Sequence, residues 1–170
     1  KEESKPIDVV MAIDTSGSMH WGEESGWGQT WANEPDSRMY QAVEAANNFI
    51  DNMTYKDRLE IWTFNPQGGS NPDPYLYKEL AYMTNGTDGN PDNKSEFKQA
   101  LIDIREGNSP WDNGNSYPYW GPNGNTPYYD TLGEAINSAT QINNNEENDR
   151  LEFVIGLADG EDNTGNLYSP

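Results

Sequence analysis

The sequence predicts an α/β fold in which helices cover both faces of a doubly wound, mainly parallel β-sheet. Three observations lead to this prediction. A length of 170 residues suits one domain with a buried core. Short apolar runs rich in β-branched residues alternate with segments whose apolar residues recur every three or four positions. This alternation is typical of parallel sheets, because their strands are joined by helices.

Four segments are predicted to be strands. The first, IDVVMAI at 7–13, is a nearly continuous apolar run, which indicates a strand buried on both faces. The second is RLEIWTF at 58–64. The third, YLYKELAYM at 75–83, is expected at an edge of the sheet, and the fourth, LEFVIGLA at 151–158, is again a buried type of run.

Three segments are predicted to be helices. Residues 37–53 have apolar positions at alternating steps of four and three, which indicates one buried face, and Asp36 is the expected N-cap. Residues 94–104 form a short second helix. Residues 126–142 form a third, with Pro127 in its first turn. The apolar positions are Met39, Val43, Ala46, Ile50 and Met53 in the first helix, and Phe97, Leu101 and Ile104 in the second.

Composition and charge exclude several classes of partner. The chain has 29 acidic and 10 basic residues, a net charge of -19. Nucleic acids and anionic membranes are therefore poor partners, because proteins bind them through Lys and Arg, whereas divalent cations are good candidates. The sequence has no Cys, which excludes disulfides, thiolate metal sites and thiol nucleophiles. No apolar run approaches the length of a membrane span, so no direct membrane insertion is expected.

Oxygen-bearing side chains follow the predicted ends of two strands. Asp14 follows the first strand in the segment DTSGS, with Ser16 and Ser18 just after it, and Asp159 follows the fourth strand. Thr126 lies where a long loop enters the third helix. If the two strands are parallel neighbours, these oxygens meet at the edge where α/β folds bind ligands. Two carboxylates and three hydroxyls, without His or Cys, suit Mg²⁺, Mn²⁺ or Ca²⁺ rather than Zn²⁺ or copper.

These segments resemble the metal-binding motifs of von Willebrand factor type A domains. DTSGS fits the motif D-x-S-x-S, and GNTPYYDTLGEAI is similar to the segment that carries the family's metal-ligating Thr. VIGLADGEDN is similar to the family's fourth strand, which ends in Asp-Gly. The three segments occur in the family's order across residues 7–163. The resemblance implies a Rossmann-like fold with a metal-ion-dependent adhesion site.

The resemblance also implies a role for each donor. Ser16 and Ser18 would contact the metal directly, and Thr126 directly or through water. Asp14 and Asp159 would act mainly through water and hold the hydroxyls in place. One coordination position would stay open for an Asp or Glu of a protein partner, because neutral hydroxyls leave the cation incompletely neutralised. The alternative is that the Ser and Thr residues only cap helices and the Asp residues only end strands.

Two long loops are rich in aromatic residues. The loop at 20–36 separates DTSGS from its helix, which is unusual for the family, and the loop at 106–125 precedes Thr126. Both are expected to border the metal, where their aromatic residues either pack on one another or form a surface that sets ligand specificity. The expected binding rim consists of Trp21, Trp27, Trp31, Trp111, Tyr117, Tyr119 and Trp120.

The resemblance further implies that the C-terminal strands and helices of the family's fold are absent from this chain. Only 11 residues follow Asp159, whereas family domains continue with two more strands and helices. Residues 1–6 are interpreted as a linker and residues 7–170 as the N-terminal two-thirds of such a domain. The fourth strand would then be an exposed apolar edge, and a second polypeptide is expected to complete the sheet.

The predicted function is a non-enzymatic, extracellular or cell-surface module that binds a protein partner through a divalent cation. The alternative is an intracellular assembly or regulatory subunit of an ATP-driven, chelatase-type machine. Two further possibilities are a carbohydrate-binding module and a metal-dependent hydrolase. The hydrolase is disfavoured because no general base with a partner is visible near the site. The sole histidine, His20, lies in a loop, so protease-like interpretations of IDTSGS lack a base.

Overall fold

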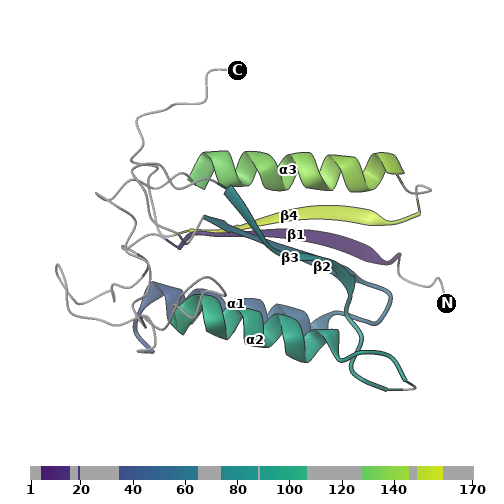
Figure 1. The fold of residues 1–170 in the computed structure, drawn as a ribbon, viewed down its shortest axis with the longest axis horizontal. Coiled ribbons are helices and arrows are strands. Elements are labelled where there is room, and N and C mark those ends of the chain that lie inside the picture. Colours follow the sequence, from purple (N-terminus) through teal and green to yellow (C-terminus); the bar gives the residue numbers. More distant parts are fainter. Residues whose placement is uncertain are drawn as a thin grey trace.

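The structure, a computed structural model, describes residues 5–15, 19, 35–64, 74–87, 89–106, 128–145 and 149–158. These residues form an α/β fold with a mainly parallel sheet, as the sequence predicts (Figure 1). The strands are β1 (Ile7–Ile13), β2 (Arg58–Phe64), β3 (Pro74–Tyr82) and β4 (Leu151–Leu157). The helices are α1 (Arg38–Asn52), α2 (Asn93–Glu106) and α3 (Tyr128–Asn145).

The four strands form one sheet in the order β3–β2–β1–β4. β1 pairs in parallel with both β2 and β4, and the antiparallel β3 lies at an edge, as predicted. The central position of β1 agrees with its composition, since six of its seven residues are buried. Helices α1 and α2 cover one face of the sheet, and α3 covers the other (Figure 1).

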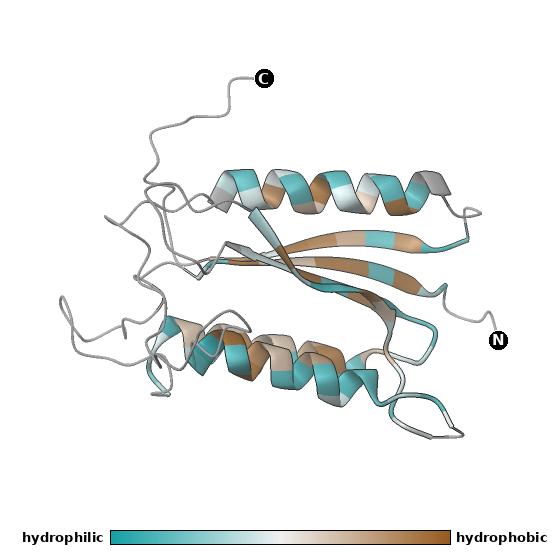
Figure 2. Ribbon diagram, viewed as in Figure 1, coloured by the Kyte–Doolittle hydropathy of each residue, from teal (hydrophilic) through white to brown (hydrophobic). Residues whose placement is uncertain are grey.

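The core lies on both sides of the sheet. Alternate residues of β1 contribute to the two sides, because side chains alternate across a strand. Val9, Met11 and Ile13 join the cluster that includes α1 and α2, whereas Val10 and Ala12 join the cluster that includes α3. Figure 2 shows hydrophobic colour on the strands and hydrophilic colour over much of the helices. The predicted helix faces are confirmed by the buried residues Met39, Val43, Ala46 and Ile50 of α1, and Phe97 and Leu101 of α2.

The predicted N-cap of α1 is wrong by one residue. The cap is Ser37, whose Oγ accepts a hydrogen bond from the backbone N–H of Tyr40 at 3.0 Å. Asp36 lies in the preceding turn and is exposed. Ser and Asp are comparable N-caps. Because Ser37 is completely buried, packing at the start of the helix decides which of the two takes the position.

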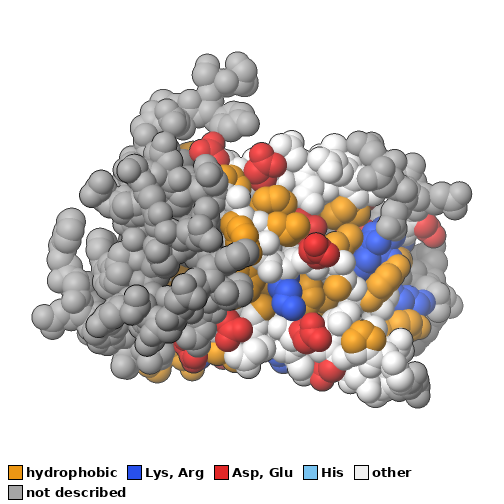
Figure 3. Space-filling view, viewed as in Figure 1, with side chains coloured by type: hydrophobic (Ala, Val, Ile, Leu, Met, Phe, Trp, Pro, Cys, Tyr) orange, Lys and Arg blue, Asp and Glu red, His pale blue; other side chains and the backbone are white. Residues whose placement is uncertain are grey.

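The two edges of the described sheet differ in protection against further strand pairing. β3 begins with Pro74, pairs with β2 through two register irregularities, and presents Lys78 to Glu96 at 3.4 Å. Figure 3 views the molecule from this side and shows acidic and basic side chains among the apolar ones. β4 contains neither Pro nor Lys, pairs in unbroken register, and leaves Leu151 and Phe153 exposed by 46% and 48%. The exposed apolar edge that the sequence predicts is therefore present among the described strands. The burial that the composition of this segment predicts is wrong, because β4 lies at the edge of the described sheet and none of its seven residues is buried.

A buried ion cluster links three strands at the N-terminal end of β1. Asp8, which is 2% exposed, accepts hydrogen bonds from Arg58 Nε at 2.8 Å and Nη2 at 2.6 Å. It also accepts from Arg150 Nε at 2.8 Å. Arg150 donates further to the backbone carbonyls of Ile7 at 3.1 Å and Lys56 at 2.7 Å. Because these residues belong to β1, to β2 and to the approach to β4, the cluster ties the parallel strands together.

Two carboxyl groups at this end of the sheet have lowered pKa values. Burial raises the pKa of Asp8, but hydrogen bonds from the two arginines outweigh burial and hold that pKa below its usual value. Burial also raises the pKa of Asp57, and hydrogen bonds from the backbone N–H groups of Thr54 and Ile7 again bring it below the usual value. Both groups are therefore charged in the folded protein at neutral pH.

Candidate metal centre

The candidate site lies where β1 and β4 end and α1 and α3 begin (Figure 1). β1 and β4 pair in parallel from Ile7 opposite Leu151 to Ile13 opposite Leu157. The backbone N–H of Asp14 extends this pairing by donating to the carbonyl of Leu157 at 2.8 Å. The predicted site required two parallel neighbouring strands, and this requirement is met.

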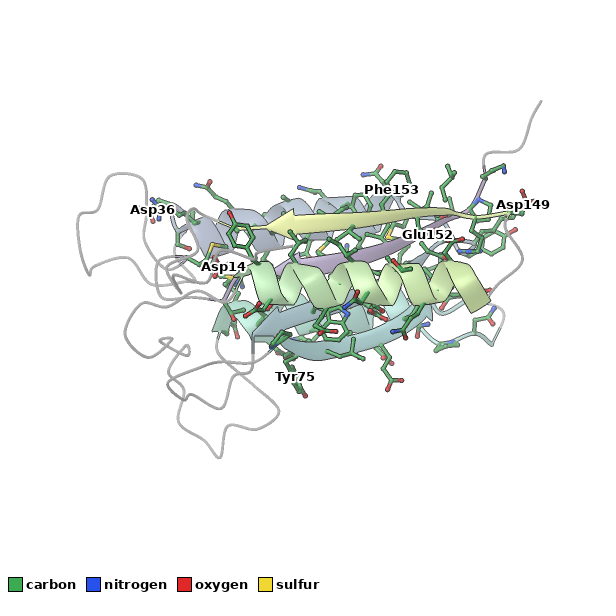
Figure 4. The ribbon with its side chains drawn as sticks, turned by 90° about the horizontal axis from the view of Figure 1, so that it is seen from above. Asp14, Asp36, Tyr75, Asp149, Glu152 and Phe153 are labelled. Carbon is green, nitrogen blue, oxygen red and sulfur yellow. The ribbon has the colours of Figure 1, made fainter. Side chains whose placement is uncertain are left out.

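Asp14 occupies the C-terminal end of the central strand, and its side chain is almost fully buried, at 1% exposure. Figure 4 shows Asp14 and the exposed Asp36 at the same end of the molecule. A buried carboxylate is costly unless it is hydrogen-bonded or paired, so a position like this one is typical of a structural or binding role. Asp14 is the one predicted donor that lies within the described residues.

The other four predicted donors, Ser16, Ser18, Thr126 and Asp159, lie outside the described residues. Their neighbours in the sequence are described. β4 ends at Leu157, two residues before Asp159, and α3 begins at Tyr128, two residues after Thr126. Met19, which follows Ser18, is buried in the core beneath α1. The described residues nearest to these donors in the sequence therefore lie at this end of the sheet.

The donor chemistry fits a hard divalent cation. Within the described ranges, no group of three or more His, Cys, Asp or Glu side chains could hold a metal ion. The predicted centre is of another type, because three of its five donors are hydroxyls and only Asp14 falls in those ranges. Hydroxyl and carboxylate oxygens are the ligands that Mg²⁺ and Ca²⁺ prefer. The buried aspartate at a parallel strand end is compatible with such a centre.

A hollow of about 350 Å³ lies between the first turns of α1 and the end of β4. One wall includes Leu157, whose carbonyl accepts the hydrogen bond from Asp14. Sequence reasoning did not find this hollow, because it depends on how close a helix comes to a strand more than 100 residues away. The described residues that line it are Met19, Arg38, Gln41, Ala42, Gly156, Leu157 and Ala158. The seven aromatic residues of the predicted rim lie outside the described parts of the chain.

Comparison with known proteins shows similarity of fold. No protein-family model and no curated protein matches the chain. Three solved structures resemble it with TM-scores of 0.50. They are an uncharacterized membrane-spanning protein from Vibrio fischeri at 18% identity, a mutant of the PilB minor pilin from Streptococcus sanguinis at 14%, and the pilus adhesin SpaC from Lactobacillus rhamnosus GG at 18%.

The similarity covers 84%, 94% and 95% of this chain, in the same order, but 52%, 31% and 16% of the other chains. This chain thus spans about half of the first protein, a third of the second and a sixth of the third. At these identities the likeness shows the fold alone. None of the helices in the described ranges is long and apolar enough to cross a membrane.

Proposed function

We propose that this chain is a divalent-cation-dependent protein-binding module of the adhesion type, built as a von Willebrand factor type A domain. The observation that carries the proposal is the parallel pairing of β1 with β4. It brings Asp14 to the strand end that leads into Asp159. Ser16, Ser18 and Thr126 complete the proposed donor set. Mg²⁺ is the proposed ion, with Mn²⁺ or Ca²⁺ as alternatives of the same chemistry.

The proposed arrangement explains why a chain would combine hydroxyls with carboxylates here. Neutral hydroxyls in direct contact leave positive charge uncompensated, so a carboxylate from outside is attracted to the open position. The chain's own carboxylates act mainly through water. Asp14, buried and anchored through its backbone to β4, provides a fixed acceptor. A partner's Asp or Glu fills the open position and no bond is broken, so the module is not an enzyme.

A place at the cell surface is part of the same proposal. Two of the three similar structures are a minor pilin and a pilus adhesin. Both are longer than this chain, which agrees with a module inside a larger extracellular or surface protein. The aromatic residues of the loops at 20–36 and 106–125 are proposed to shape specificity around the cation.

Calorimetric titration of Mg²⁺, Mn²⁺ and Ca²⁺ into metal-stripped protein tests the metal centre. We expect one saturable site, measured at high salt to suppress diffuse binding to the acidic surface. The site should be lost in Asp14→Asn. Asp36→Asn is the matched control, because Asp36 lies at the same end of the molecule but is exposed and is not a proposed donor. Equal binding by wild type and Asp14→Asn would overturn the proposed centre.

We further propose that a strand from a second polypeptide pairs with β4 and completes the sheet. The support is the β4 edge, which carries neither Pro nor Lys and where Leu151 and Phe153 are half exposed. Figure 4 labels Phe153 and Glu152 on this strand. Sedimentation analysis of residues 1–170 should show self-association that Phe153→Lys reduces. Tyr55→Lys, at an exposed tyrosine outside β4, should leave it unchanged. A well-folded monomer at all concentrations would contradict this part of the proposal.

A further inference from the structure

The hollow between α1 and β4 has the size and lining of a small binding site. Its volume of about 350 Å³ lies at the lower end of the range for ligand pockets, about 300–1,000 Å³. Met19, Ala42 and Leu157 supply apolar surface. Arg38 and Gln41 supply a guanidinium and an amide, and Gln41 is exposed to solvent. Apolar walls can bury an apolar side chain of a peptide ligand, and the few polar groups can form hydrogen bonds with the backbone of that ligand.

The hollow adjoins the proposed cation site along the chain. Met19 directly follows Ser18, and Ala158 directly precedes Asp159. The carbonyl of Leu157 accepts a hydrogen bond from the backbone N–H of Asp14. Consecutive Cα atoms of a peptide are about 3.8 Å apart. In a bound peptide, the residue that neighbours the cation-binding residue would therefore lie about that distance from it. A single peptide segment can therefore reach both places.

Charge favours an acidic occupant at this point of the surface. The chain as a whole carries a net charge of -19 and would repel acidic peptides. The proposed divalent cation would offset this repulsion locally for a segment that carries a carboxylate.

We infer that the hollow receives an apolar side chain of the partner, from the residue adjacent to the Asp or Glu that binds the cation. The inference rests on the proposed function and names its ligand class: a peptide segment in which an acidic residue is followed or preceded by an aliphatic one. The cation would attract any peptide that carries a carboxylate. The hollow would then distinguish between such peptides by the side chain next to the carboxylate.

Two blocked peptides, acetyl-Gly-Gly-Asp-Leu-Gly-amide and acetyl-Gly-Gly-Asp-Ser-Gly-amide, test the inference in NMR titrations of labelled protein with Mg²⁺. The leucine peptide should bind about tenfold more tightly or better, since burial of one leucine side chain is worth at least that ratio. Ala42→Phe fills the hollow and should abolish the difference. Ala45→Phe, on the exposed side of the same helix, is the matched control and should preserve it.

The outcomes separate this inference from the proposed function. Equal affinity for the two peptides, or a difference that Ala42→Phe leaves intact, overturns the role of the hollow while the cation site stands. Failure of both peptides to bind a protein that takes up Mg²⁺ also overturns it. Failure to take up Mg²⁺ at a single site overturns the proposed function, and this inference with it.

Discussion

Replacing Asp8 by Asn is expected to destabilise the folded chain strongly while the shape of the side chain is kept. Asp8 is buried and accepts three hydrogen bonds of 2.6–2.8 Å from Arg58 and Arg150. An Asn side chain has one acceptor oxygen and an NH₂ group that cannot accept from a guanidinium. The variant therefore leaves largely buried cations without their carboxylate.

The surroundings of Asp8 determine the size of the effect. Removing one partner of a buried ion pair costs about 3–5 kcal/mol, and both arginines that lose this partner are largely buried. An exposed pair contributes only about 0.2–1 kcal/mol. Because a domain of this kind is stable by about 5–15 kcal/mol, the loss in Asp8→Asn is a large part of the total.

Urea unfolding followed by circular dichroism at neutral pH measures this effect. Asp51→Asn is the control, since it removes an exposed pair with Lys98, and it should change the free energy of unfolding by less than about 1 kcal/mol. Combining Asp8→Leu with Arg58→Met and Arg150→Met should recover much of the loss, because no uncompensated charge then remains. A loss in Asp8→Asn no larger than in Asp51→Asn would refute the view that the cluster holds the strands together.

Three further outcomes follow from individual side chains. The pKa of Asp8 is lowered in the folded state, so the stabilisation by its charged form is fully present above about pH 4 and is lost as the pH falls through the lower pKa of the folded state. The difference in unfolding free energy between wild type and Asp8→Asn should therefore shrink in acid. Urea unfolding at several pH values measures this difference. Ser37→Ala removes the N-cap of α1 and should cost about 1 kcal/mol in urea unfolding. Burial, and then the neighbouring Asp103 and Tyr75, raise the pKa of Tyr77 to about 12; an absorbance titration of tyrosinate should show a late component that is absent in Tyr77→Phe.

Local pattern was sufficient to locate the strands and helices. β1 and β2 have the predicted bounds, and the other elements begin or end within three residues of their predicted bounds. The reason is that burial of one face imposes a repeat on the sequence, of two residues in a strand and 3.6 in a helix. The same local reasoning placed the cap of α1 one residue early, at Asp36, because it could not weigh how each candidate packs.

The partners of Asp8 in the buried ion cluster could not be predicted from local sequence patterns, for a different reason. An aspartate inside the apolar run of β1 was a visible signal that a buried partner exists. Arg150, one of its partners, lies 142 residues further along the chain. Nothing in the sequence near Asp8 indicates which of the distant cations reaches it, because that depends on which strands become neighbours.

The sequence by itself determined the fold class, the acidic character and the kind of donors available, since these follow from residue type and short-range spacing. Only the tertiary structure decided that β4 is the parallel neighbour of β1, and hence that Asp14 meets the strand leading to Asp159. It also decided that α1 leaves a hollow beside that strand end, and that Phe153 stays exposed at the β4 edge. These features depend on the pairing of segments far apart in the chain. A local residue pattern indicates which side chains are buried, but it does not indicate which distant segment they pack against.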